Sequence, residues 1–193
     1  MVPILVGAID KVQEADYGSI LAPYLADPAN FFVVSSDFCH WQVVSCRFCT
    51  FLTLYRGTRF RYTFYYPEPL PSNLAGVRLK GYGAQPYDLL QRPIHSSISE
   101  LDHEAMDTLA ISPKPEVGAP AAQSHAKFSE YLDRTGNTIC GRHPIGVLLG
   151  ALSELERSGK QAKIEWVRYE QSSQCHSIRD SSVSYASAYA TIL

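Results

Sequence analysis

The sequence carries little net charge and no long apolar run. Its formal net charge of −2 at pH 7 argues against nucleic acid or an acidic membrane surface as the main partner. No apolar stretch approaches the roughly 20 residues that cross a bilayer, so no membrane span is expected. The apolar first nine residues lack the basic leader and cleavage site of a signal peptide. Five cysteines, an odd number, favour a reducing compartment over a disulfide framework.

The length and composition suit one α/β domain over residues 1–193, since 46% of the residues are apolar and 11% aromatic. Val2–Val6 and Phe31–Val34 are continuous apolar stretches, predicted as strands buried on both faces of a parallel sheet. Helical spacing over Ala15–Leu25 lies between them, which indicates a crossover unit. Ligands collect at the carboxyl ends of such strands, where Asp37 and His40 follow.

Further along the chain, apolar spacing predicts three helices and two strands. The helices are Ser97–Leu109, with Ser97 and Glu100 as a capping box, Gln123–Leu132 and Pro144–Arg157; the strands are Lys163–Glu170 and Val183–Ile192. Two stretches fit this pattern poorly. Residues 42–56 are apolar and cysteine-bearing, and residues 67–93 are rich in proline and glycine, which predicts a loop insertion.

The stretch Asn137–Gly146 (NTICGRHPIG) places Cys140 just ahead of a well-marked helix. Pro144 suits its first position, and Gly159 its end. The free N–H groups of a helix N-terminus, together with a neighbouring cation, favour thiolate over thiol. Cys140 is therefore predicted to be a metal ligand or a reactive thiolate, against the alternative of a small buried side chain.

Several segments in this order resemble the C-terminal half of the MEMO family (mediator of ErbB2-driven cell motility). They are Val2–Ala8, Tyr24–Pro28 with Phe32–Trp41, Arg59–Tyr62, Asn137–Gly146, and Tyr169–Cys175 with Asp180–Ala186. The family shares its fold with the LigB-type, class III non-haem iron extradiol dioxygenases. The resemblance thus implies a central mixed sheet with flanking helices.

The resemblance also implies a pocket at one end of the sheet, with a metal site of two histidines and one cysteine. Cys140 matches the cysteine ligand, Asp37 and His40 match pocket-lining residues, and Arg61 matches an arginine at the rim. The family is described as a cytoplasmic signalling effector that binds phosphotyrosine-bearing receptor segments and iron or copper. A nuclear location is left open, and no dioxygenase activity is established for it. This chain is expected to be a binding protein rather than an enzyme.

The sequence departs from the family in two respects. The family's histidine ligands lie in Pro-His-Ala-Gly and Pro-Ser-His-His contexts of its N-terminal half, and neither occurs in this sequence. Residues 42–56 interrupt the junction between Trp41 and the Arg59 segment, beginning Gln-Val-Val-Ser as a translated intron boundary does. We therefore expect a truncated form that lacks the N-terminal half, with a retained intron at 42–56 and an incomplete metal site.

Each candidate residue has a plainer alternative. Asp37 and His40 form either an acid/base or outer-shell pair or a hydrogen-bonded turn. His143 either reaches the pocket or caps its helix. The basic-aromatic strand around Arg61 either takes a phosphate or is an ordinary strand. Cys46 and Cys49 could belong to a zinc knuckle with Cys39 and His40, but their spacing from Cys39 is wrong for the common patterns.

No role in the site is expected for the remaining histidines or for Cys175. His95, His103 and His125 are expected on solvent-exposed helix faces, and Cys175 in a structural loop. Two enzymatic alternatives stay open: an oxidoreductase related to the class III dioxygenases, and a Cys–His hydrolase with Cys140 as nucleophile.

Overall fold

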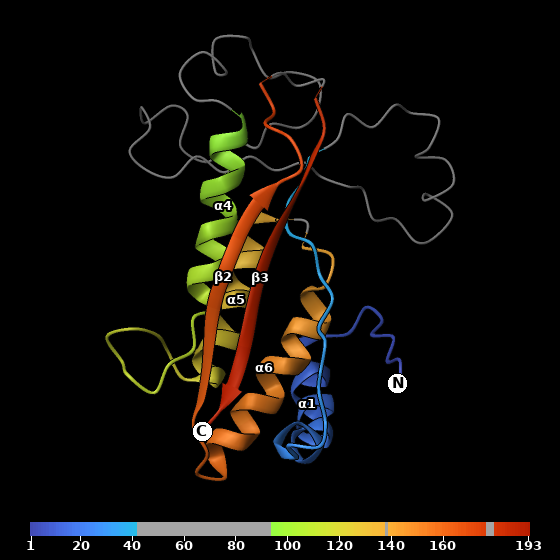
Figure 1. Cartoon of the computed structure of the whole chain (residues 1–193), viewed down its shortest axis with the longest axis vertical. Coiled ribbons are helices and arrows are strands. Elements are labelled where there is room, and N and C mark those ends of the chain that lie inside the picture. Colours follow the sequence, from blue (N-terminus) through green and yellow to red (C-terminus); the bar gives the residue numbers. More distant parts are fainter. Residues whose placement is uncertain (42–93, 138, 177–179) are drawn as a thin grey trace.

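The computed structural model describes residues 1–41, 94–137, 139–176 and 180–193. The helices there are α1 (Lys11–Ala26), α4 (Ile94–Thr108), α5 (Ala121–Thr135) and α6 (Arg142–Arg157), and the strands are β1 (His40–Trp41), β2 (Ala162–Gln171) and β3 (Ser182–Ile192). In Figure 1 the long β2–β3 hairpin lies in front of α5, with α4 to one side, α6 to the other, and α1 beside α6. The expected α/β class is confirmed.

The sheet has the strand order β1-β3-β2. β2 and β3 pair antiparallel from Ala162 opposite Ile192 to Gln171 opposite Ser184, with a register shift between Trp166 and Arg168. β1 pairs antiparallel with the other edge of β3, which sets His40 opposite Val183. The two long strands confirm the predictions for Lys163–Glu170 and Val183–Ile192. The described strands form an antiparallel sheet, however, so the predicted mixed sheet is wrong for this part of the chain.

The main core lies between α4, α5, α6 and the hairpin. Ile98, Leu101 and Ala105 line one stripe of α4 at helical spacing and are buried. Phe128 and Tyr131 of α5 stack with ring centroids 6.4 Å apart. Full burial of a Leu, Ile or Phe side chain contributes roughly 1.5–3 kcal/mol, so this cluster is a main source of cohesion between helices and sheet.

Trp166 joins β2 to this core. Its indole N–H donates to the carbonyl of Met106 on α4 over 3.1 Å. Its ring meets that of Phe38 edge-on, with centroids 6.0 Å apart. Because Phe38 lies just ahead of β1, this contact fixes the 35–41 segment against the sheet.

Small residues let α1 and α6 approach closely. A Cβ added to Gly18 would lie 2.5 Å from the backbone nitrogen of Ala151, and one added to Gly150 would lie 2.8 Å from the carbonyl oxygen of Glu14. Ala22 continues the same buried stripe of α1. The helix predicted at Ala15–Leu25 is confirmed, but its inner face is built from small side chains rather than from large apolar ones.

The predicted helices Gln123–Leu132 and Pro144–Arg157 are confirmed within longer elements. α6 begins at Arg142, so Pro144 is its third residue rather than its first. That position still belongs to the first turn, whose N–H groups have no intrahelical acceptor. Gly159 follows α6 with φ of 91°, the left-handed conformation expected at a helix end.

The start of α4 differs from the sequence prediction. α4 already includes Ile94, so Ser97 lies inside the helix, and it is buried. The predicted capping box of Ser97 and Glu100 is therefore wrong, because a residue with helical neighbours on both sides cannot serve as an N-cap. None of the helices in the described ranges has the length and apolarity of a membrane span.

The predicted strands Val2–Val6 and Phe31–Val34 are wrong. Both segments have irregular backbone. They are largely exposed, with 99% of Leu5 and 92% of Phe31 accessible to solvent. A strand forms only by pairing, and no strand among the described residues pairs with either segment. The crossover unit inferred from them is consequently absent from this part of the chain. The predicted insertions at 42–56 and 67–93 lie outside the described residues.

Candidate functional site

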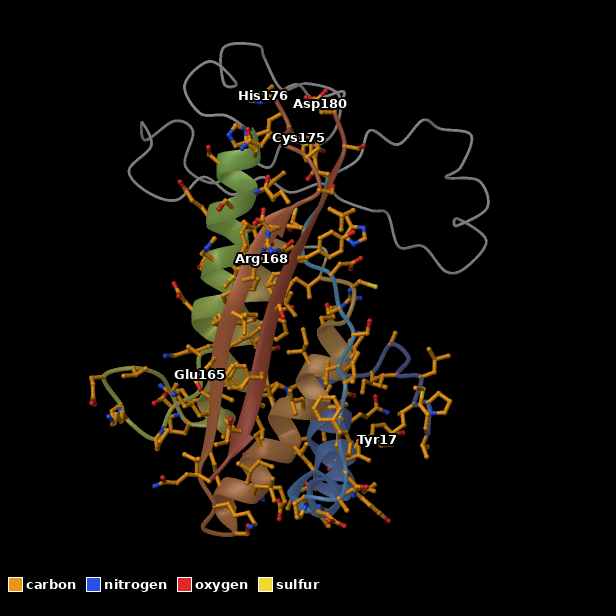
Figure 2. All side chains as sticks on the ribbon, in the orientation of Figure 1. Tyr17, Glu165, Arg168, Cys175, His176 and Asp180 are labelled. Atoms are coloured by element: carbon orange, nitrogen blue, oxygen red, sulfur yellow. The ribbon has the colours of Figure 1, made fainter. Side chains whose placement is uncertain are left out.

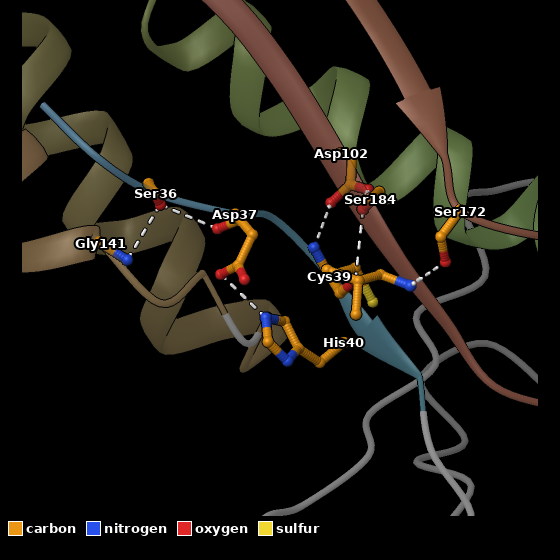
Figure 3. A network of polar contacts seen from close by, with 9 residues as sticks. Ser36, Asp37, Cys39, His40, Asp102, Gly141, Ser172 and Ser184 are labelled. Carbon is orange, nitrogen blue, oxygen red and sulfur yellow. Dashed lines mark hydrogen bonds and ion pairs between the residues drawn. The ribbon is translucent and has the colours of Figure 1, made fainter.

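Two segments far apart in the sequence meet beside the start of α6. The N–H of Gly141 donates to Ser36 Oγ over 2.9 Å, and the Ser36 hydroxyl donates to the carbonyl of Asp37 over 2.8 Å (Figure 3). The N–H of Cys140 donates to the same carbonyl over 3.3 Å. These bonds hold residues 36–40 against residues 140–141, and we call this junction the candidate site.

Gly141 is required for this approach. A Cβ at Gly141 would lie 2.5 Å from the Cβ of Ser36 and 2.6 Å from the carbonyl oxygen of Ser35. Any larger residue would therefore push the two segments apart. Gly141, which follows Cys140 in the sequence, is thus needed for close packing within the candidate site.

Asp37 and His40 face one another in the candidate site (Figure 3). His40 Nε2 lies 2.8 Å from Asp37 Oδ1, with 34% of the imidazole and 27% of the carboxyl side chain exposed. Half-burial favours the contact because fewer water molecules compete for the two groups. The carboxylate orients the imidazole ring, and an imidazole is the side chain that most often serves as a general acid or base.

Cys140 is exposed, and its backbone bond to Asp37 places it in the same junction. Helix α6 begins two residues later, at Arg142, so Cys140 precedes the N-cap, Gly141. The structure thus brings the segment of Cys140 beside the segment of Asp37 and His40. Its role as a metal ligand stays a prediction.

His143 makes its contact with a residue that the sequence did not single out. Its Nδ1 lies 2.8 Å from Oε1 of Glu14 on α1. His125 Nε2 lies 2.7 Å from the other oxygen of that carboxylate. The imidazole of His143 thus ties α6 to α1, and its pocket-lining role stays a prediction.

The predicted solvent exposure of His125 is wrong, because only 6% of this residue is accessible to solvent. Together with the buried Glu14 and the half-buried His143 it forms a polar cluster that joins α1, α5 and α6. A Cβ at Gly146 would overlap the Glu14 carboxylate, so this glycine makes room for the cluster. The repeat of Glu14, Gly18 and Ala22 at four-residue spacing was the sequence signal for a buried Glu14.

A second buried carboxyl group, Asp102 on α4, lies next to the candidate site and bonds the backbone of Cys39. It accepts hydrogen bonds from the N–H of Cys39 at 3.2 Å, from Asn137 Nδ2 at 3.0 Å, from the Tyr169 hydroxyl at 2.9 Å and from the Ser184 hydroxyl. Burial raises the pKa of Asp102, and these hydrogen bonds oppose that rise. Asp102 sits in a polar pattern (ELDHE), which gave no signal that it would be buried.

The remaining candidates are placed as follows. Cys175 is buried, as expected for a structural residue, and lies near Asp180 (Figure 2). Burial together with the charge of Asp180 raises the pKa of the Cys175 thiol to about 11. His103 is exposed as predicted, whereas His95 is half-buried, with its Nδ1 3.2 Å from the Cys175 carbonyl oxygen. Arg61 and the Cys46–Cys49 pair lie outside the described residues.

The metal site implied by the resemblance can be compared with the side chains present at the candidate site. Within the described ranges, no three His, Cys, Asp or Glu side chains are grouped so as to hold a metal ion. Cys140 with the Asp37–His40 pair therefore does not fit iron or copper by itself, because such sites usually need three protein ligands converging on one point.

The fold and the junction together define a mixed α/β protein with a small antiparallel sheet and a polar site at the start of one helix. The family model for Memo-like proteins matches residues 1–189. Protein MEMO1 of Rattus norvegicus is 39% identical over 193 residues, and Protein MEMO1 of Homo sapiens is 38% identical, each alignment covering all of this chain and 48% of the relative. The MEMO1 family protein MHO1 of Saccharomyces cerevisiae is 41% identical over 186 residues, covering 91% of this chain and 47% of that protein.

This chain belongs to the Memo-like family, which confirms the resemblance seen in the sequence. It spans about half the length of the curated relatives it matches.

Proposed function

We propose that this chain is a binding protein of the Memo-like family, with the candidate site as its ligand-contacting surface. The observation that carries the proposal is the half-buried Asp37–His40 pair held directly against the Cys140–Gly141 segment. This arrangement presents an imidazole, a carboxylate and an exposed thiol at the N-terminal end of α6. Such a surface offers polar contacts to a ligand, and the N–H groups of a helix start favour an anionic one.

The proposed partner is a phosphotyrosine-bearing segment of a receptor or signalling protein, and the proposed role is that of an effector linked to cell motility. This follows from the family resemblance, in which Arg61 contacts the phosphate. An arginine fork binds a phosphate through two parallel hydrogen bonds, which a lysine cannot reproduce. A cytoplasmic location belongs to the same proposal, as does a LigB-type fold for the complete family domain.

A fluorescence-anisotropy titration with a labelled phosphotyrosine peptide tests this partner. Arg61→Lys should weaken binding about tenfold, the equivalent of ~1.4 kcal/mol, because the charge stays but the paired hydrogen bonds are lost. The control is Arg168→Lys, since Arg168 is exposed and pairs with Glu170. Equal affinity for the phosphorylated and the unphosphorylated peptide would refute the proposed partner.

We propose iron or copper as the metal, with Cys140 as one ligand. Because the described donors do not complete a site, this proposal needs further ligands from outside the described residues. Equilibrium dialysis of the full chain against copper or ferrous iron, with and without Cys140→Ser, tests it. Uptake that is the same in the wild type and in Cys140→Ser would exclude Cys140 as a ligand.

One observation favours a second candidate, an oxidoreductase related to the class III dioxygenases. A carboxylate-oriented imidazole such as that of His40 is the usual arrangement for a general base. Oxygen uptake with a catechol, lost in His40→Gln, would support this activity. In the hydrolase alternative, His143 is engaged by Glu14, so a Cys–His pair would have to combine Cys140 with His40.

A further inference from the structure

Asp102 is a fully buried carboxyl group that accepts four hydrogen bonds. None of the partners that the structure gives it among the described residues is a cation. A buried carboxylate without a counter-charge costs desolvation free energy, which hydrogen bonds to its oxygens offset. Burial raises the pKa of Asp102 because removing the charged carboxylate from water is unfavourable. A reason other than bulk stability is needed for its place in the core.

The donors to Asp102 come from both segments of the candidate site. Cys39 lies between Asp37 and His40, and its N–H donates to one carboxylate oxygen (Figure 3). Asn137 lies three residues ahead of Cys140, and its side-chain amide donates to the same oxygen over 3.0 Å. One oxygen on α4 therefore anchors the segment with the Asp37–His40 pair and the segment with the thiol.

The other oxygen of Asp102 holds the sheet in register with these segments. The Ser184 hydroxyl on β3 donates to it. The backbone of Ser184 exchanges two further bonds with the site segment: its N–H donates to the Cys39 carbonyl over 3.1 Å, and its carbonyl accepts from the N–H of Phe38 over 2.8 Å. The position of Cys39 is thus fixed from the helix side and from the strand side.

We propose that Asp102 is a positioning residue of the candidate site, which sets the relative placement of residues 37–40 and 137–141. The proposal rests on the proposed function only in treating Asp37, His40 and Cys140 as one site. It goes beyond that function by assigning the control of the site to a buried group on α4, which bonds Cys39 and Asn137 of the two site segments.

Two substitutions separate positioning from general stability. Asp102→Leu keeps the approximate volume but removes all four hydrogen bonds. Asp102→Asn can still accept from Cys39 and Asn137 through its amide oxygen, while the hydroxyls of Tyr169 and Ser184 rotate to accept from its NH₂ group. Ser124→Ala is the matched control, since the buried Ser124 hydroxyl bonds only the Thr108 carbonyl at 2.5 Å. Asp102→Asn should therefore rescue what Asp102→Leu loses.

The measurements are amide hydrogen exchange and the ring nitrogen chemical shifts of His40, both in the full chain. In Asp102→Leu, the amides of Cys39 and Gly141 should exchange about tenfold faster relative to those of the α1–α6 interface. The His40 shifts should move toward those of an Asp37→Asn reference. Asp102→Asn should restore both readouts, and Ser124→Ala should move neither. If Asp102→Leu does not fold, Ser184→Ala should show the same pattern with smaller amplitude.

Uniform acceleration of exchange over the whole chain, with unchanged His40 shifts, would overturn the proposal and leave Asp102 a merely structural residue. So would a failure of Asp102→Asn to restore the His40 shifts. Neither readout uses a ligand. A failure of the phosphopeptide titration would therefore refute the proposed function and leave the result for Asp102 intact.

Discussion

His125 donates a hydrogen bond from Nε2 to the Glu14 carboxylate over 2.7 Å, joining α5 to α1 although 111 positions separate the two residues. His143 occupies the second oxygen of the same carboxylate at 2.8 Å. One carboxylate thus satisfies two imidazoles from different helices. Because His143 lies two residues after Gly141, the cluster also supports the start of α6 beside the candidate site.

Glu14→Ala should be strongly destabilising. It leaves the N–H groups of His125 and His143 without their acceptor inside a helix interface, which costs about 2–4 kcal/mol of unfolding free energy. Urea denaturation followed by circular dichroism measures the change. Asp16→Ala is the control, since Asp16 is exposed on the same helix, and it should stay within about 0.5 kcal/mol of the wild type. An equal effect of the two substitutions would show that the cluster contributes nothing.

Gly18→Ala should also destabilise, although alanine is the better helix former by about 1 kcal/mol. The new methyl group would meet the backbone of Ala151 at 2.5 Å, and backbone atoms cannot move aside as a flexible side chain can. Overpacking of this kind costs roughly 1–3 kcal/mol. Gly7→Ala, where no atom lies within 4 Å of the added Cβ, is the control. A rise in the melting temperature of Gly18→Ala would contradict the close approach of α1 and α6.

The sequence predicted the elements whose apolar spacing is regular and whose partners are local. α5, α6 and the β2–β3 hairpin are of this kind, and each was expected within a few residues of its bounds. Val2–Val6 and Phe31–Val34 failed because an apolar run shows that a segment tends to pair but cannot show that a partner strand is present. Those two errors have the same physical cause.

The candidate site was predicted in part for a similar reason. Asp37, His40 and Cys140 were singled out because they follow a strand-like run or precede a helix and match residues of the family's site, and their roles stay predictions. Glu14 and Asp102 were missed because a charged residue on a helix is by default expected on the solvated face. For Asp102, only the contacts with partners distant in the sequence reveal the burial, whereas Glu14 shares a four-residue spacing with the buried Gly18 and Ala22.

The raised pKa of Asp102 makes a pH-dependent contribution to stability. Because the folded-state pKa lies above the ordinary value of 3.8, the native state binds the proton more tightly than the unfolded chain does. The contribution of Asp102 is therefore most favourable below that value and is lost as the pH rises through the folded-state pKa. The difference in unfolding free energy between wild type and Asp102→Asn should fall from about pH 4 upward and then level off.

Urea titrations of both proteins across this range measure that difference. Comparing the two proteins at each pH cancels the titration of all other groups. A wild type that gains stability relative to Asp102→Asn as the pH rises would show that the hydrogen bonds to the carboxylate outweigh its desolvation, and would reverse the direction assigned to its pKa.

The two cysteines Cys140 and Cys175 should differ sharply in reactivity. Cys140 is exposed, whereas Cys175 is buried with a thiol pKa of about 11, so that at pH 8 only about one in a thousand Cys175 thiols is ionised. Iodoacetamide followed by peptide mass spectrometry should label Cys140 at least about tenfold faster. In urea the two rates should converge. Equal rates in the folded chain would place Cys175 at the surface.

The most direct test of the binding role is a chemical-shift titration of the ¹⁵N-labelled full chain with a phosphotyrosine peptide and its unphosphorylated twin. The account predicts shifts concentrated at the amides of residues 36–40 and 140–143, with the phosphorylated peptide alone. Shifts elsewhere with none at these positions, or the same shifts with both peptides, would contradict it.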